Sequence, residues 1–510
     1  MIKTITKFQT FLLILGLGLI FLLVYSPHFG YPLPFHIDEW HHISESIRMG
    51  GYGDYFENLR IMAAQRFSGL ELGFHFVLFL FSWVLDLVSI YKFLPAIWAV
   101  LSGLALFYIV FKKTNNNFYL SFLSVIFFAS IKSNVNLTGF WFFTPLTFSI
   151  PFIFLYLYFF TEGLETKNKN FILGSLFIIL ILIPTHSISV LFSTLILLTF
   201  MLINYKYILK NILFFVSFLI IPVVGILFYK YTLDVAWGEL FSHFWEAIQF
   251  KYGWGVFEVR NSPSEVYSWA GYIFALIGLL AILFTKQVRK YLLWIVWPAI
   301  LIVFIILYHI TGVSFLSPYQ RNFYYLALSF PFLSAFGFYS FLVFVRKYLR
   351  KFFFLSSNKN SGAINISIKI DTKYERLTLN LVSAFLIIAM LISIFAGYYF
   401  IPRQLSLYHA INEFDYNTLI FLKGLPLGRV ISDPFMAATI FPITGMEPVA
   451  DINFYGDKKI IEEFFLFSDC ARKKEIIKDQ NVKYVISPAP LECDFEVIYA
   501  QQGNIIYQFE

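Results

Sequence analysis

The stretch His36-Ile37-Asp38-Glu39-Trp40-His41-His42 places two adjacent carboxylates among three imidazoles, directly after the first apolar segment of the chain. It is the densest group of proton-handling side chains in the sequence. Ionisable residues at membrane depth are costly, and they are mostly found where they are used. The position of this stretch at the mouth of an apolar helix therefore favours a functional role, and we interpret the rest of the chain around it.

The composition is that of a multi-pass membrane protein. The chain has 510 residues, of which 59% are hydrophobic and only 14% are charged. Soluble proteins are about a quarter charged and at most half apolar, and many apolar runs here approach the roughly 20 residues that a bilayer demands. We expect a mainly α polytopic fold with about 11–13 transmembrane helices, followed by a small soluble α/β domain.

The basic residues predict the orientation of the helices. They collect in short loops, most strongly in 346–376, which carries eight lysines and arginines. Because positively charged loops stay in the cytoplasm, the N-terminus is expected inside, and the net charge of +7 does not indicate a nucleic-acid partner. The loops expected outside are 26–68, 132–139, 230–267 and 311–322, together with the tail.

The number of crossings is constrained by parity. Two apolar segments lie between loop 26–68 and Lys112, where only an odd number of crossings agrees with the charge pattern. One of them, or another short span, is therefore expected to be re-entrant or half-buried.

Two domains are expected, a transmembrane domain over 1–400 and an extracytoplasmic α/β domain over 401–510. In the second, the sequence predicts helices at 411–423 and 458–479, strands at 429–432 and 483–487, and a hairpin over 495–509. Both cysteines, Cys470 and Cys493, fall in this domain. A disulfide and two free thiols fit the sequence equally well.

The external loops carry apolar side chains at helical spacing. Residues 38–67 predict two short surface helices separated by glycines. In loop 230–267 the pattern predicts one apolar face in the headgroup layer, formed by Trp237, Phe241, Phe244, Trp245 and Ile248.

Asp38 and Glu39 are the candidate catalytic residues. A carboxylate near the bilayer surface is partly desolvated, which raises its pKa and makes it a usable base near neutral pH. Adjacent helical residues diverge by about 100°, so one carboxylate is expected to face a cavity while the other caps a helix or pairs with a cation. The alternative is an acidic N-cap and first turn without catalysis.

The histidines of this stretch have two interpretations. His36, His41 and His42 can contact phosphate or lipid headgroups, which we favour, or Asp38 and His42 can hold a divalent ion at i, i+4 spacing. The order of residues is not that of a His-Glu-x-x-His zinc motif. No cofactor is therefore expected.

Isolated cations near the outward ends of the helices are candidate phosphate ligands. A guanidinium binds a phosphate through two parallel hydrogen bonds, although snorkelling to the interface explains such residues equally well. The best candidate is Arg321, in Ser317-Pro-Tyr-Gln-Arg-Asn322. The others are Arg60, Arg66 and Arg260.

His186, in Pro184-Thr-His-Ser187, lies between the apolar spans 171–184 and 186–203. Proline and histidine together predict a broken helix beside a polar cavity. A hydrogen-bonded histidine between helices is the alternative interpretation, and His186 is also a candidate substrate contact.

The layout resembles the GT-C class of polytopic glycosyltransferases, which includes protein O-mannosyltransferases and aminoarabinose transferases. His36-Ile-Asp38-Glu39 looks like the acidic signature in the first external loop of several such families. Surface helices after the signature, the stretch 317–336 and a soluble α/β tail add to the likeness. Ile37 departs from the proline found in several families, and no Asp-x-Asp of the metal-dependent oligosaccharyltransferases is present.

The resemblance implies an inverting transfer from a polyprenyl-phosphate sugar to a lipid, glycan or protein acceptor on the extracytoplasmic face. Asp38 would then correspond to the base and Arg321 to the phosphate ligand. The alternatives are a transporter or flippase for lipid-linked glycans, which places its charges near the bilayer midplane, and an O-antigen ligase or polymerase, for which loop 230–267 is the candidate site.

Overall fold

The computed structural model describes most of the chain. The described residues are 5–50, 71–133, 139–217, 220–232, 236–251, 262–285, 287–359, 372–396, 409–452, 456–501 and 503–509. The expected second surface helix of loop 38–67, together with Arg60, Arg66 and Arg260, lies outside them.

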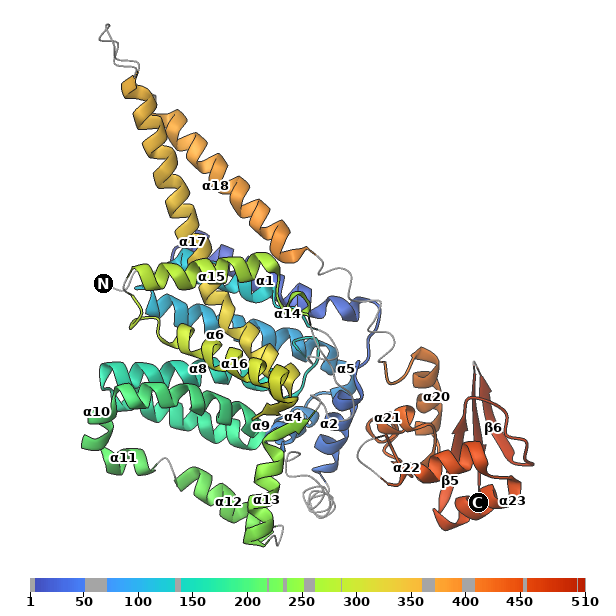
Figure 1. Ribbon diagram of the computed structural model, residues 1–510. Coiled ribbons are helices and arrows are strands. Elements are labelled where there is room, and N and C mark those ends of the chain that lie inside the picture. Colours follow the sequence, from blue (N-terminus) through green and yellow to red (C-terminus); the bar gives the residue numbers. More distant parts are fainter. Residues whose placement is uncertain are drawn as a thin grey trace.

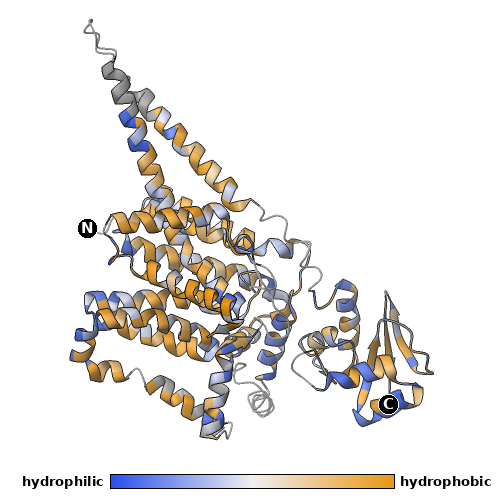
Figure 2. Cartoon of the chain, in the orientation of Figure 1, coloured by the Kyte–Doolittle hydropathy of each residue, from blue (hydrophilic) through white to orange (hydrophobic). Residues whose placement is uncertain are grey.

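A bundle of long apolar helices forms the first domain, and a smaller domain follows it (Figure 1). Apolar residues dominate the bundle, whereas hydrophilic residues gather at its ends and on the second domain (Figure 2). The bundle helices are α1 (Lys7–Tyr25), α6 (Leu94–Lys113), α7 (Phe118–Ala129), α8 (Pro145–Thr166), α9 (Lys169–Ile203), α15 (Trp269–Phe284), α16 (Leu293–Thr311), α17 (Tyr319–Lys359) and α18 (Thr372–Phe395).

Shorter elements join these helices. The helical ones are η1 (Ser26–Phe29), α2 (Ile37–Arg48), α4 (Leu72–Ser82), α5 (Leu87–Ile90), η3 (Tyr91–Phe93), α10 (Tyr205–Lys210), α11 (Ile212–Val216), α12 (Ile220–Thr232), α13 (Trp237–Ala247) and α14 (Pro263–Val266). Strands β1 (Gln249–Lys251) and β2 (Val313–Phe315) pair antiparallel.

The loops that were expected outside meet at one end of the bundle. The backbone N–H of Lys132 donates to the carbonyl of Val266, the β1–β2 pair joins loop 230–267 to loop 311–322, and the Tyr31 hydroxyl donates to the carbonyl of Ile411. At the other end, Lys113 pairs with Glu162 and Glu165. The two sets of loops are thus separated as the charge pattern predicts.

Helix α4 explains the parity of the crossings. Glu71, just before it, lies beside His42. After it, the Tyr91 hydroxyl donates to the carbonyl of Phe143, at the same end of the bundle. A helix of 11 residues spans only about 16 Å. The first of the two apolar segments expected between loop 26–68 and Lys112, residues 69–90, therefore enters the bundle and returns without crossing it.

Helix α9 is a hairpin of two arms. His186 has non-helical backbone angles, φ −158° and ψ 81°. Beyond the second arm, the Tyr207 hydroxyl donates to the carbonyl of Lys167, just before the first arm. A straight helix of 35 residues would be about 50 Å long, so the chain must reverse at His186. The expected break between the spans 171–184 and 186–203 is confirmed.

The number of crossings does not follow from helix length alone. Among the described residues, seven helices are long and apolar enough to cross a membrane. In this count the two arms of α9 are one helix. Helices α7 and α15 are not counted, because they are apolar but shorter.

Close backbone packing joins α15 to α17. A Cβ added at Gly278 would lie 2.0 Å from the carbonyl oxygen of Leu333, and one added at Gly337 would lie 1.9 Å from that of Phe274. Small residues at such a crossing let two helices approach until their backbones touch. The middle of α17, the helix that begins just before Arg321, is thereby fixed against its neighbour.

The C-terminal domain contains a five-stranded mixed sheet in the order β4-β3-β5-β7-β6. Its helices are α20 (Glu413–Lys423), α21 (Pro434–Thr444), α22 (Lys458–Glu462), η7 (Glu463–Phe467) and α23 (Cys470–Asp479). Its strands are β3 (Arg429–Ile431), β4 (Glu447–Pro448), β5 (Val482–Ser487), β6 (Glu496–Gln501) and β7 (Asn504–Gln508).

The prediction of a single helix over 458–479 is wrong. It is divided into α22, η7 and α23, because Ser468 is extended and Asp469 caps a new helix by accepting from the backbone N–H of Arg472. Helix α21 was not predicted from the sequence. Cys470 and Cys493 form a disulfide, which settles the alternative that the sequence left open.

The C-terminal domain packs against the back of α2. Arg48, near the end of α2, pairs with Glu447 and lies 4.1 Å from the centre of the Phe441 ring. Tyr31 stacks on His409 at 3.7 Å between ring centres. The helix that carries Asp38 is therefore held between the bundle and the second domain.

Helix α13 presents apolar side chains to its surroundings, as expected for a surface helix. Trp237, Phe241 and Trp245 are 49%, 71% and 60% exposed. Aromatic rings of this kind are stable in the headgroup layer of a bilayer.

We predict that Gly337→Ala lowers the melting temperature of the detergent-purified protein, because the added methyl group meets the backbone of α15. The expected loss is about 2–3 kcal/mol, as for overpacked cores. Gly18→Ala in α1 is the matched control, since nothing lies within 4 Å of its added Cβ. Equal melting temperatures for the two variants would contradict the close packing of α15 and α17.

Candidate functional site

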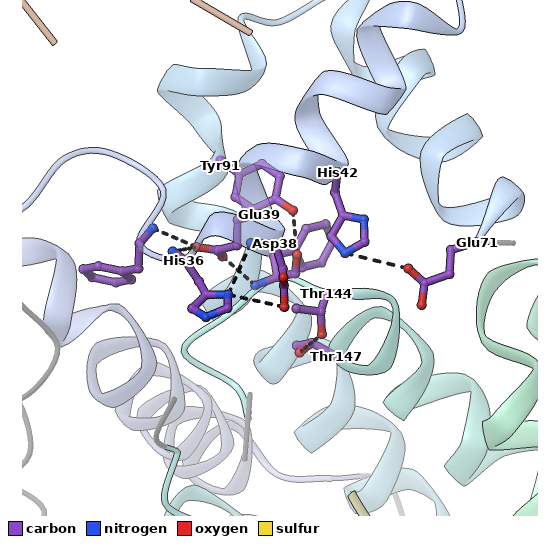
Figure 3. A network of polar contacts seen from close by, with 10 residues as sticks. His36, Asp38, Glu39, His42, Glu71, Tyr91, Thr144 and Thr147 are labelled. Atoms are coloured by element: carbon purple, nitrogen blue, oxygen red, sulfur yellow. Dashed lines mark hydrogen bonds and ion pairs between the residues drawn. The ribbon is translucent and has the colours of Figure 1, made fainter. Parts of the chain in front are cut away.

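The acidic stretch forms the first turn of α2. His36 is the N-cap, and Glu39 closes a capping box with it. Such an arrangement satisfies backbone N–H groups that have no partner inside the helix. Both carboxylates thus enter the site from one well-defined helical turn (Figure 3).

Glu39 is fully buried and works as an anchor. Its Oε2 accepts from the backbone N–H groups of Phe35 at 2.8 Å and His36 at 3.1 Å, and its Oε1 accepts from that of Phe143 at 2.8 Å. Burial raises the pKa of Glu39 to about 7, although these three N–H groups oppose the shift. This carboxylate fastens the start of α2 to the segment that precedes α8.

Asp38 points the other way and is the more open carboxylate, with 37% of its side chain exposed. Its Oδ2 lies 3.3 Å from Nδ1 of His36. Burial acts to raise the pKa of Asp38, but His36, with His42 and Arg321, outweighs it and lowers the pKa. The expectation from the sequence, that burial dominates and raises the pKa of this carboxylate, is therefore wrong for Asp38. Asp38 is instead an ionised carboxylate at neutral pH.

Arg321 contributes positive charge to the site from a different helix, α17. It lies in the first turn of α17, and its charge acts on Asp38, Glu71 and His42. Burial raises the pKa of Glu71 to about 8, an effect that Arg321 opposes. Residues far apart in the sequence therefore share one electrostatic environment.

The break in α9 is tied to α17 next to Arg321. Nδ1 of His186 lies 2.7 Å from Oγ of Ser189, which lies 2.9 Å from the Tyr325 hydroxyl, one turn beyond Arg321. Tyr325 also stacks on Phe192 at 3.9 Å between ring centres. His186 thus has the hydrogen-bonded interhelical position of the alternative interpretation, and its backbone break is part of the wall of the site.

A second polar group lies beside the acidic turn. His42, one turn after Asp38, approaches Glu71 and His75 at the start of α4 (Figure 3 shows the contact with Glu71). Nδ1 of His42 lies 3.1 Å from Nε2 of His75, and its Nε2 lies 3.8 Å from Oε2 of Glu71. Packing of Gly73 against Pro184 fixes α4 at the break in α9.

The structure brings together most of the residues expected in the site. Asp38, His36, His42 and Arg321 share one electrostatic environment, and His186 lies at its edge. His41 is buried and its ring centre lies 6.3 Å from that of His75, at the margin of the cluster.

Glu71 and His75 were missed by the sequence analysis. They were hidden in an apolar run that was interpreted as a membrane span. A signal was present, because Glu71 and His75 repeat the i, i+4 spacing of Asp38 and His42, and ionisable residues inside an apolar segment are functional candidates by default.

No protein-family model matches the chain, and no curated protein matches it. Solved structures do. The apo structure of ArnT from Cupriavidus metallidurans matches with a TM-score of 0.55 and 13% identity, over 98% of this chain and 98% of that one. ArnT from the same organism bound to undecaprenyl phosphate matches with a TM-score of 0.53 and 12% identity, over 99% and 98%.

An oligosaccharyltransferase also matches. AglB from Archaeoglobus fulgidus, in complex with an inhibitory peptide and a dolichol-phosphate, has a TM-score of 0.53 and 12% identity, over 94% of this chain and 69% of that one. At these identities the likeness concerns the fold. The GT-C resemblance expected from the sequence is confirmed at that level.

We predict that Glu39→Gln destabilises the protein by roughly 2–3 kcal/mol, because one carbonyl oxygen cannot accept the hydrogen bonds of three backbone N–H groups. Thermal unfolding in detergent at pH 8, where Glu39 is mainly ionised, measures the effect. Asp38→Asn is the matched control and should melt close to the wild type. If Glu39→Gln melts with the wild type, Glu39 is not the anchor of α2.

Proposed function

We propose that this chain, which has the GT-C fold, is an inverting glycosyltransferase that moves a sugar from a polyprenyl-phosphate donor to an acceptor hydroxyl on the extracytoplasmic face. The observation that carries the proposal is the pairing of an accessible carboxylate, Asp38, with the guanidinium of Arg321 in one electrostatic environment. Two of the similar structures hold lipid phosphates, which supports the class of donor.

Asp38 is proposed as the base. The acceptor oxygen attacks the anomeric carbon while the bond from that carbon to the phosphate oxygen breaks, and the hydroxyl proton passes to Asp38. An ionised carboxylate is a weak base, but the hydroxyl proton becomes acidic as the new bond forms, so late transfer to Asp38 is favourable. Glu39 is then a positioning residue, because its hydrogen bonds set where this turn of α2 lies.

Arg321 is proposed to bind the phosphate of the donor. The leaving lipid phosphate gains negative charge in the transition state, and a fixed cation stabilises that charge. Its place in the first turn of α17 adds the partial positive charge of a helix N-terminus. The contact of the Tyr325 hydroxyl with Ser189, one turn after Arg321, holds this part of α17 before the donor binds.

Two observations support the assignment to the extracytoplasmic face. The site lies at the end of the bundle opposite the basic pair Lys112-Lys113. The domain at the same end contains the disulfide Cys470–Cys493, and disulfides persist in oxidising compartments.

A transporter of lipid-linked glycans is the alternative to distinguish. Its essential charges would lie near the middle of the bundle, whereas the charges of this site lie where the loops join the helices. Purified protein incubated with a panel of polyprenyl-phosphate sugars should release or transfer the sugar. Donor movement in proteoliposomes without cleavage of the sugar–phosphate bond would instead support transport.

We predict that Asp38→Asn keeps the fold but lowers sugar transfer by about 10²–10⁴-fold, the usual contribution of a general base. Transfer of labelled sugar by the detergent-purified protein is the measurement. Asp86→Asn is the matched control, since Asp86 directly precedes α5, accepts from the Ser89 hydroxyl and is not among the groups whose charge acts on Arg321. A wild-type rate for Asp38→Asn would remove Asp38 from catalysis.

We predict that Arg321→Ala raises the KM for the donor by roughly 10–100-fold, the worth of a hydrogen-bonded charge, with a smaller change in the KM for the acceptor. The donor KM of Arg321→Lys should lie between those of the wild type and Arg321→Ala, because lysine keeps the charge but loses the planar guanidinium. An unchanged donor KM in Arg321→Ala would place the phosphate elsewhere.

A further inference from the structure

A group of imidazole and carboxylate side chains lies next to the proposed catalytic turn and has no part in the reaction described above. His42, Glu71 and His75 each offer one ligand atom, and these atoms all lie within 4.8 Å of one another. The two imidazoles are 6% and 3% exposed. Such a buried convergence of nitrogen and oxygen donors suits a metal ion.

We propose that His42, Glu71 and His75 bind a divalent metal ion of the zinc class. Two imidazole nitrogens and one carboxylate oxygen are a ligand set that zinc prefers, and three protein ligands leave a fourth position for water or a phosphate oxygen. The proposal is independent of the glycosyltransferase assignment, because it concerns binding alone.

The distances fit this coordination with little rearrangement. Metal–ligand bonds of about 2.0–2.1 Å in a tetrahedral site place ligand atoms roughly 3.3–3.4 Å apart. Nδ1 of His42 and Nε2 of His75 are 3.1 Å apart. Oε2 of Glu71 lies 3.8 Å from Nε2 of His42, whereas Nδ1 of His42 faces His75. One ligand atom from each residue lies within 4.8 Å of the others, so a rotation of the His42 ring or a change of the Glu71 rotamer completes the set.

The backbone holds these ligands before any ion binds. His42 lies in the middle of α2, which Glu39 anchors at its start and Arg48 at its end. Glu71 and His75 flank the first turn of α4. Contacts elsewhere in the fold already position both helices. Less conformational entropy is therefore lost when the ligands bind a metal ion, which raises the metal affinity.

The charges around the group bear on cation binding. The carboxyl groups of Asp38 and Glu71 and the guanidinium of Arg321 act on one another. A bound dication would displace the proton of Glu71 and make the local charge more positive. A nearby anionic phosphate would then be stabilised.

The site revises the metal hypothesis drawn from the sequence. That hypothesis paired Asp38 with His42. In the structure His42 joins Glu71 and His75 instead, while Asp38 pairs with His36. The expectation that no cofactor is needed rested on the absence of a contiguous zinc motif, whereas these ligands come from two separate helices.

The test measures metal content and affinity directly. Tag-free protein is stripped with a chelator in detergent and titrated with Zn²⁺ against a chromophoric competitor. The wild type should bind about one equivalent tightly, and Glu71→Gln and His75→Gln should each weaken that binding at least about 100-fold, beyond the effect of losing an outer-shell partner.

His41→Gln is the matched control, because His41 is a buried imidazole on the same helix that lies outside the ligand group. It should keep the affinity of the wild type. Melting temperatures with and without Zn²⁺ guard against misfolding, since bound metal should stabilise the wild type and His41→Gln but neither ligand variant. Absence of tight binding in the folded wild type, or equal affinity in the ligand variants, would overturn the proposal.

Discussion

The hydrogen bonds that backbone N–H groups give to Glu39 are the constraint on which the site depends. They join the start of α2 to Phe143, at the entrance of α8, through a carboxylate that no water reaches. A buried acceptor of this kind is costly to remove, because each N–H left without a partner loses its hydrogen bond in a dry environment. The hydrogen bonds of Glu39 leave it no open oxygen for a reaction, and they fix the helical turn from which its neighbour Asp38 projects.

Fixed elements on each side then give the site its charge pattern. Asp38 and His42 come from α2, Glu71 and His75 from the short α4, and Arg321 from α17. The break at His186 lets the hairpin of α9 pack against both α4 and α17. Opposite charges are therefore held together by packing, at the depth where the bundle ends.

The sequence predicted what composition, charge and periodicity determine. These features yielded the membrane fold, the grouping of loops at each end, the break at His186 and the strands of the second domain except β4. They could not show that the apolar run around His75 turns back, because hydropathy does not distinguish a short returning helix from a span. These features also could not show which carboxylate, Asp38 or Glu39, is the buried anchor, because that depends on the hydrogen bond from Phe143. Nor could they predict that the pKa of Asp38 is lowered, because that depends on the combined effect of His36, His42 and Arg321.

The contact of the second domain with α2 has a consequence for biosynthesis. The guanidinium of Arg48 packs on Phe441 and pairs with Glu447, and Tyr31 bonds to Ile411. All three partners belong to the second domain, which is synthesised after the helices of the bundle. The helix that bears the acidic turn therefore completes its packing only after the second domain has been made. A chain that stops before this domain can form the bundle but leaves α2 without these contacts.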